Sequence, residues 1–118
     1  MKRLFALTLL AAPVLFTGQA QAHAHLQVAA PAAGASVAAP KAISLQFNEK
    51  LSAKFSGVQL MRNDTGANVD VAPVASKNPK GLQVAPKAPL TPGEYMVMWH
   101  AVGTDGHRLT GNYNFTVK

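Results

Sequence analysis

Short runs of alternating apolar and polar residues are the feature that most restricts how this chain can fold. The clearest run covers residues 95–101, in which Tyr, Val, Trp and Ala alternate with Met, Met and His. Similar runs cover residues 43–47, 58–61, 82–84 and 113–117, and residues 25–28 are a candidate first strand. A period of two is typical of half-buried β-strands, and no long stretch has a helical period.

Clusters of Pro, Gly, Asn and Asp separate these runs and indicate turns. The spacing between turns is close to the eight to twelve residues expected of a sandwich or barrel. We therefore predict an all-β chain, a small immunoglobulin-like β-sandwich of about seven strands. The chain contains no cysteine, so aromatic side chains must supply much of the core. The expected core aromatics are Phe47, Phe55, Tyr95, Trp99 and Phe115.

The first 22 residues have the features of a secretory signal peptide. Lys2 and Arg3 precede an apolar segment, residues 4–16, that is short for a membrane-spanning helix, and residues 20–22 read Ala-Gln-Ala. We predict cleavage after Ala22, which leaves residues 23–118 as a single exported domain that does not span a membrane. The alternative, an uncleaved membrane anchor, is disfavoured by the cleavage motif.

The basic charge of the chain does not indicate nucleic-acid binding. Loss of Lys2 and Arg3 with the leader would lower the formal net charge from +6 to +4, and the remaining Lys and Arg are spread along the sequence. A nucleic-acid surface would need a basic stripe with aromatic stacking groups.

Cleavage after Ala22 would give His23 a free α-amino group beside its imidazole. The amine has an ordinary pKa of about 7.7–8.0, so a metal can displace its proton near neutral pH. The two nitrogens can chelate one ion, and such nitrogen ligands suit Cu(II).

A second pair of candidate ligands, Asp105 and His107, follows the predicted strand at residues 95–102. Gly106 between them allows the backbone to turn so that both side chains face one point. With His23 they would give three nitrogens and one oxygen. Asp-Gly is also a common turn without any metal, so the prediction depends on the combination with His23.

His25 leaves a second binding mode open. In the sequence His23-Ala24-His25, the amine, two deprotonated amides and the His25 imidazole could hold Cu(II) without a folded scaffold. The alternative uses the His23 imidazole with Asp105 and His107, and His25 is then a further ligand or a neighbour of the ligands. We favour the mode that uses Asp105 and His107, because it avoids ionising two amides.

Several segments resemble the CopC-type family of periplasmic copper-binding proteins from bacterial copper-resistance systems. They are "SLQFNEKL" (44–51), "FSGVQL" (55–60), "PLTPGEYMVMWHAVGTDGHRLTG" (89–111) and the final "YNFTVK". The resemblance covers essentially the whole chain after the leader. It implies a Greek-key β-barrel or sandwich and a Cu(II) site formed by His23, Asp105 and His107, with Glu49 hydrogen-bonded to a ligand histidine.

The chain departs from some family members in its methionines. Those members carry a methionine-rich loop that forms a separate Cu(I) site, whereas the matching region here, Arg62–Gly81, contains no methionine. Because soft thioethers select Cu(I), we predict a protein that binds Cu(II) alone. Met61, Met96 and Met98 remain, and Met96 and Met98 could share one strand face; they are expected to serve in packing or to be partly exposed. His100 is expected to be exposed or on an edge strand.

The resemblance favours a periplasmic Cu(II) carrier or buffer over an enzyme. Its partners would be the copper ion and an inner-membrane copper transporter or another periplasmic copper protein. The rival hypothesis is a histidine-brace copper monooxygenase. Such enzymes are usually larger and present a flat aromatic face, whereas this chain has few aromatic residues.

Overall fold

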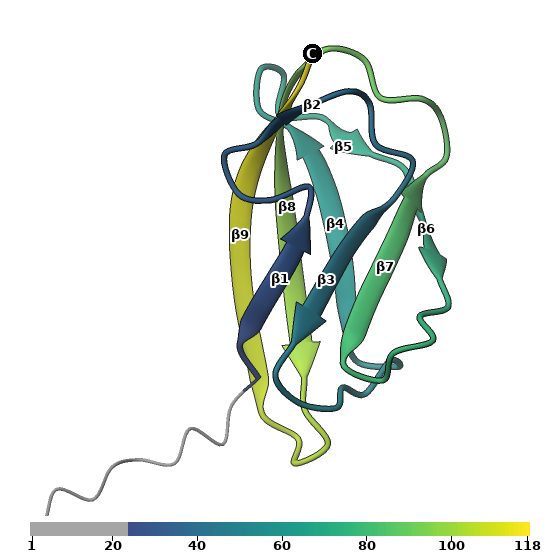
Figure 1. Ribbon diagram of the computed structural model, residues 1–118, viewed down its shortest axis with the longest axis vertical. Coiled ribbons are helices and arrows are strands. Elements are labelled where there is room, and N and C mark those ends of the chain that lie inside the picture. The colour runs from purple at the N-terminus through teal and green to yellow at the C-terminus, as the bar shows by residue number, and fades with distance from the viewer. Residues whose placement is uncertain (1–23) are drawn as a thin grey trace, which may run out of the picture.

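The computed structural model describes residues 24–118 as two β-sheets packed face to face (Figure 1). One sheet has the strand order β1-β3-β7-β6 and the other the order β2-β9-β8-β4-β5. Within these residues the strands are β1 (Leu26–Ala30), β2 (Ser36–Val37), β3 (Ile43–Phe47), β4 (Gly57–Arg62), β5 (Asn68–Val69), β6 (Val71–Val74), β7 (Gly81–Pro86), β8 (Gly93–Val102) and β9 (Arg108–Val117). The predicted all-β sandwich is confirmed.

The predicted signal peptide, its cleavage after Ala22 and His23 lie outside the described residues. Residues 24–118 contain no helix long and apolar enough to cross a membrane.

Strand β8 is the centre of the five-stranded sheet. It pairs antiparallel with β9 along its whole length, from Gly93 opposite Val117 to Val102 opposite Arg108. On its other side it pairs with β4, from Gly57 opposite His100 to Arg62 opposite Tyr95. Because side chains alternate along a strand, this register fixes which residues face the core and which face outward.

The core lies between the two sheets and is rich in aromatic side chains. The rings of Phe47 and Trp99 meet edge to face at 5.1 Å across the sandwich, and those of Tyr95 and Phe115 stack at 5.6 Å. Burying each large apolar side chain contributes roughly 1.5–3 kcal/mol to stability. Gly111, opposite Trp99 in the register, leaves room for the indole, which a Cβ at this position would overlap.

Phe55 is the one predicted core aromatic that the structure places outside. It is 59% exposed and lies in the turn before β4, where its backbone N–H donates to the Ser52 carbonyl at 3.2 Å. A turn lacks the alternation that would direct the ring inward, so the prediction for Phe55 is wrong.

Two further differences from the sequence-based expectations concern strands. The described residues form nine strands rather than about seven. β2 and β5 have only two residues each and are too short to show a period, and β6, with the sequence VAPV, has no alternation of apolar and polar residues. His100 is half-buried on the central strand β8, not on an edge.

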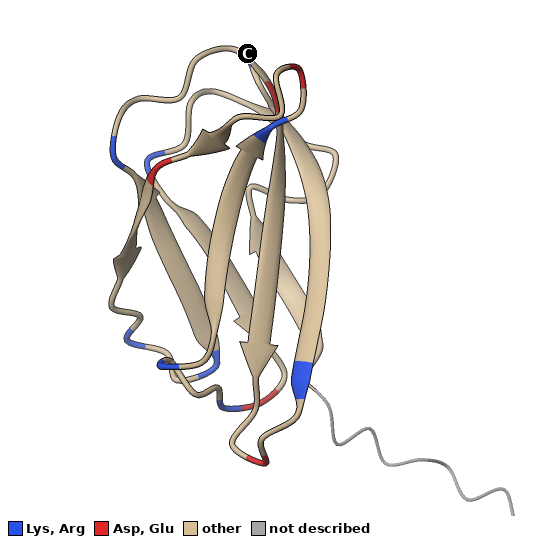
Figure 2. Ribbon diagram, turned by 180° about the vertical axis from the view of Figure 1, so that it is seen from behind, with Lys and Arg blue, Asp and Glu red and all other residues tan. Residues whose placement is uncertain are grey.

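Charged residues of the described chain lie mostly at strand ends and in loops. Figure 2, which views the five-stranded sheet from outside, shows the middle of its long strands free of Lys, Arg, Asp and Glu. The outer surface of this sheet is therefore largely uncharged along its length.

Candidate metal centre

Residues 103–107 form a tight loop that joins β8 to β9 at one end of the sandwich. The Gly103 N–H donates to the His107 carbonyl at 3.0 Å, and the Gly106 N–H donates to the Gly103 carbonyl at 3.0 Å. Gly106 has a φ of 87°, a left-handed conformation that glycine adopts without steric cost. The backbone therefore turns at Gly106, as the sequence predicts.

This turn brings Asp105 and His107 into contact. Asp105 Oδ2 lies 2.7 Å from His107 Nδ1, and the His107 backbone N–H donates to Asp105 Oδ1 at 3.1 Å. Both side chains are exposed. Hydrogen bonds from the His107 imidazole and then from its backbone hold the pKa of the Asp105 carboxyl below its ordinary value, so the carboxylate is ionised at neutral pH.

The Asp105–His107 contact is compatible with two metal-binding arrangements. Ligand atoms about 2.0 Å from one divalent ion and at a right angle to each other lie about 2.8 Å apart, close to the observed separation. Alternatively, Asp105 accepts the Nδ1 proton and orients the ring, so that Nε2 carries the lone pair that a metal needs.

Glu49 reaches the same loop from the segment that follows β3. Leu51 forms an isolated bridge with Gly103, and the Ser52 N–H donates to the Val102 carbonyl at 2.8 Å. A Cβ on Gly103 would overlap Glu49 Oε1 and lie 2.9 Å from Asp105 Oδ1. The carboxylates of Glu49 and Asp105 thus both lie close to Gly103. Only glycine, which has no side chain, leaves room for them at this position.

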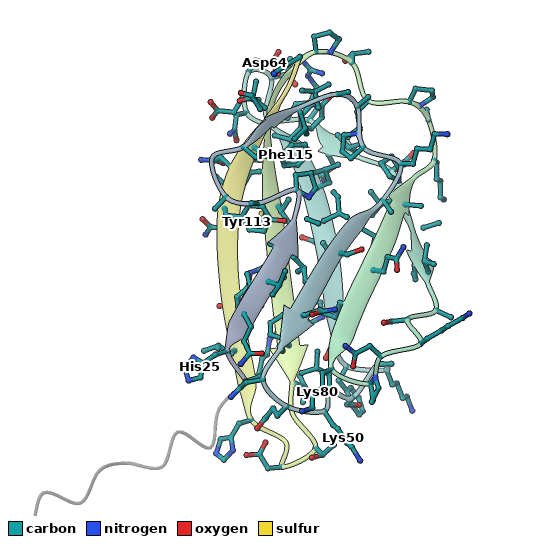
Figure 3. All side chains as sticks on the ribbon, in the orientation of Figure 1. His25, Lys50, Asp64, Lys80, Tyr113 and Phe115 are labelled. Carbon is teal, nitrogen blue, oxygen red and sulfur yellow. The ribbon has the colours of Figure 1, made fainter. Side chains whose placement is uncertain are left out.

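The beginning of the described chain is fixed at this end by Asn48. The His25 N–H donates to Asn48 Oδ1 at 2.5 Å, and the Asn48 N–H donates to the His25 carbonyl at 3.1 Å. Ala24 is only 3% exposed and belongs to the core. Figure 3 shows His25 at the same end of the sandwich as Lys50, the residue after Glu49.

The structure thus gathers four of the residues singled out in the sequence at one end: His25, Glu49, Asp105 and His107. His100 lies apart, with its ring over Gly57 on the outer face of the sheet. Sequence reasoning missed Asn48 and Gly103, although both stand beside singled-out residues, in "FNEKL" and "VGTDGH".

Two of the three proposed ligand residues, Asp105 and His107, belong to the described chain, and His23 does not. Across residues 24–118, no three side chains of His, Cys, Asp or Glu are close enough together to hold a metal ion.

Comparison with known proteins gives relatives that match along most of their length. The chain is 44% identical over 106 residues to copper resistance protein C of Escherichia coli, covering 84% of each chain. It is 40% identical over 118 residues to copper resistance protein C of Pseudomonas syringae pv. tomato, covering 94% of this chain and 93% of that protein.

A solved structure has the same fold. The crystal structure of PcoC, described as a methionine-rich copper resistance protein from Escherichia coli, superposes with a TM-score of 0.76 at 40% identity and covers 82% of this chain and 100% of that one. The family model described as the CopC domain matches residues 26–118. From these matches and the shared sandwich, the chain belongs to the CopC domain family.

Proposed function

We propose that this protein is a periplasmic Cu(II)-binding protein that carries or buffers copper in copper resistance or homeostasis. One Cu(II) ion is the cargo. Its ligands are the α-amino group and imidazole of His23, exposed by cleavage after Ala22, together with Asp105 and His107. Family membership and the names of the copper resistance relatives support this function.

The observation that carries the proposal is the convergence of the chain start and the Asp105–His107 loop at one end of the sandwich. Ala24 is buried and His25 is hydrogen-bonded to Asn48 on both its N–H and its carbonyl. A chain that begins at His23 would present its terminal amine one residue before this anchor, and consecutive Cα atoms are only about 3.8 Å apart. Glu49, next to Asn48, reaches the same loop.

The same contacts favour the folded site over the short-peptide mode. The peptide mode needs the amide nitrogens of Ala24 and His25 as ligands, but the His25 N–H donates to Asn48. Ala24 would also have to leave the core, where it is 3% exposed. Binding through the loop keeps both contacts, and His25 then remains a neighbour of the site.

Glu49 acts in this proposal as a hydrogen-bond partner that orients a ligand. Outer carboxylates of this kind fix the orientation of metal-binding imidazoles and raise their basicity. Its position beside Asp105 gives the centre a second negative charge, which favours a divalent cation.

The surface of the described residues favours a binding protein over an oxidative enzyme. Phe55 is the one aromatic among the exposed large hydrophobic residues of the described chain, which are Val28, Phe55 and Val74. A flat aromatic surface for a polymeric substrate would need several such rings. Loaded protein is therefore expected to give no ascorbate-driven, oxygen-dependent polysaccharide cleavage.

The test compares a chain beginning at His23 with one carrying a single extra residue before it, by Cu(II) titration against a chelator and electron paramagnetic resonance. The extended chain should lose the parent spectrum and most of its affinity. Asp105→Asn and His107→Ala should each weaken binding by about tenfold or more, while His25→Ala should bind as the parent does. Unchanged affinity in both loop variants, with loss in His25→Ala, would establish the peptide mode instead.

A further inference from the structure

All three methionines of the described chain share one face of the five-stranded sheet. Met61 lies on β4, and Met96 and Met98 lie on β8. Met61 is directly opposite Met96 in the register, and Met98 is two residues further along β8. The residues next to them in sequence, such as Leu60, Val97 and Trp99, are buried between the sheets, so the methionines are on the outer face.

This arrangement brings the three thioethers within reach of one point. Directly opposite residues of an antiparallel pair have Cβ atoms about 4.5–5.5 Å apart, and diagonal neighbours about 7–8 Å apart, within reach of long side chains. Met61 is the direct partner of Met96 and the diagonal neighbour of Met98. All three side chains are half-buried, so they remain partly accessible from solution.

The neighbours of the methionines on this face are mostly uncharged amides. Gln59 and Asn112 flank Met98 on the two adjacent strands, and Asn114 flanks Met96 on β9. No Lys occupies an outward position beside the three methionines on β4, β8 or β9 within the described chain.

The charged groups of this face lie to either side of the methionines. Glu94, two residues before Met96, carries a carboxylate that accepts a hydrogen bond from Asn63 Nδ2 at 2.7 Å. Arg108, at the start of β9, lines a surface hollow together with Met98 and His100. The methionines thus lie between a carboxylate on the Met96 side and a guanidinium on the Met98 side, so the attraction for a soft cation rests on the thioethers themselves rather than on a net negative charge.

We propose that Met61, Met96 and Met98 form a second metal site, which takes a soft monovalent cation such as Cu(I) or Ag(I). Uncharged, polarisable thioethers select Cu(I), whereas nitrogen and oxygen ligands suit Cu(II). Met96 and Met98 lie six and four positions before Val102 on β8, or about 20 Å and about 13 Å at 3.3 Å per residue, so this site is distinct from the Asp105–His107 end.

The proposal revises the expectation that the protein binds Cu(II) alone. That expectation considered the methionine-free region Arg62–Gly81 and the pair Met96 and Met98. It did not place Met61 on the same face, because Met61 is 35 positions before Met96 in the sequence and joins the other two only through the pairing of β4 with β8. Strand register, rather than a methionine-rich loop, supplies the third thioether.

The test uses Ag(I), which is not redox-active under these conditions, on the chain beginning at His23 with ¹³C-labelled methionine methyl groups. The three methyl resonances should shift together and saturate at one equivalent of Ag(I). Met61→Leu, Met96→Leu and Met98→Leu conserve side-chain volume, and each should weaken binding by about tenfold or more. Binding should persist near pH 5, because thioethers do not take up protons while His ligands do.

The control is the double variant Asp105→Asn/His107→Ala, which should bind Ag(I) as the parent does whether or not the proposed Cu(II) site exists. Far-ultraviolet circular dichroism of each Leu variant checks the fold. Methyl resonances that do not shift, that saturate independently of one another, or that shift equally in the Leu variants would overturn the proposal, as would a triple Leu variant that keeps the parent affinity.

Discussion

Two tyrosine hydroxyls of this sandwich have opposite surroundings. The Tyr95 hydroxyl donates to the Thr91 carbonyl at 2.7 Å and accepts from Arg62 Nη1 at 2.6 Å. The Tyr113 hydroxyl is buried and has no hydrogen-bond partner among the described residues, and burial raises the pKa of Tyr113 to about 12. A buried polar group without a partner reduces stability, whereas a hydrogen-bonded one contributes to it.

These surroundings predict opposite effects for the same substitution. Tyr113→Phe should leave the free energy of unfolding unchanged or raise it by up to about 1 kcal/mol, while Tyr95→Phe should lower it by about 1–2 kcal/mol. Urea unfolding of the two variants and the parent measures both values. Equal losses of unfolding free energy in the two variants would contradict the interpretation that the buried Tyr113 hydroxyl reduces stability.

The Arg62–Asp64 pair should make stability depend on acid pH. Arg62 donates to the Asp64 carboxylate through Nε at 3.0 Å and Nη2 at 2.9 Å, and this pair holds the pKa of the Asp64 carboxyl below its ordinary value. A carboxyl whose pKa is lower in the folded state stabilises the fold above its ordinary pKa, and this contribution disappears as the pH falls through the folded value.

Asp64→Asn should therefore be less stable than the parent at neutral pH, and the two proteins should converge toward about pH 2. The difference should be small because both groups are solvent-accessible. Urea unfolding across this pH range measures it, with the exposed Asp70→Asn as the matched control. A difference between parent and Asp64→Asn that stays constant with pH would rule out this linkage.

At the scale of elements, the β8–β9 hairpin carries the candidate centre on a turn that needs glycine. Gly106 in this turn and Gly66 in the β4–β5 turn have φ values of 87° and 71°, and a Cβ at either position would meet no atom within 4 Å. The two glycines therefore differ in location but not in the kind of backbone conformation they adopt.

Gly106→Ala and Gly66→Ala should each cost about 1–2 kcal/mol of stability, because a left-handed conformation disfavours a Cβ. Only Gly106→Ala should also weaken Cu(II) binding, because its loop holds Asp105 and His107 together. Calorimetric titration of both variants with Cu(II) provides the comparison. Equal Cu(II) affinities in the two variants would show that the conformation of this loop does not contribute to Cu(II) binding.

The elements that sequence could predict are those with a clear period. The alternation of residues 95–101 predicts β8, and Asp-Gly-His predicts the turn after it. The first half of β9 is not apparent from the sequence, because Thr110, Gly111 and Asn112 lack apolar alternation and become a strand only through pairing with β8. The contacts of Asn48 and Gly103 could not be predicted from the sequence either, because they join segments that are far apart in the chain. Asn48 and His25, for example, are 23 positions apart.

For the molecule as a whole, the proposed Cu(II) site would join the two sheets. β1 belongs to the four-stranded sheet, and the loop holding Asp105 and His107 belongs to the five-stranded one. A ligand set drawn from both exists only in the native state, so binding should stabilise the fold.

Cu(II) at a free concentration 100 times its Kd should raise the free energy of unfolding of the chain beginning at His23 by about 2.7 kcal/mol. A peptide-type site would also form in the unfolded chain and would cancel most of this gain. Thermal unfolding with and without Cu(II) distinguishes the two, and the chain with one extra residue before His23 is the control. Stabilisation of that extended chain to the same degree would contradict a site that spans the sheets.

The long strand β9 also separates the candidate metal centre from the C-terminus. It begins directly after the Asp105–His107 loop and runs the length of the sandwich to Lys118 (Figure 1), about 30 Å at 3.3 Å per residue. A fluorescent reporter or surface tether fused after Lys118 would thus stand clear of the candidate metal centre. Molecules attached by this tail to an electrode or bead would all present that centre to the solution, so that an oriented layer could report copper if the proposed site binds it.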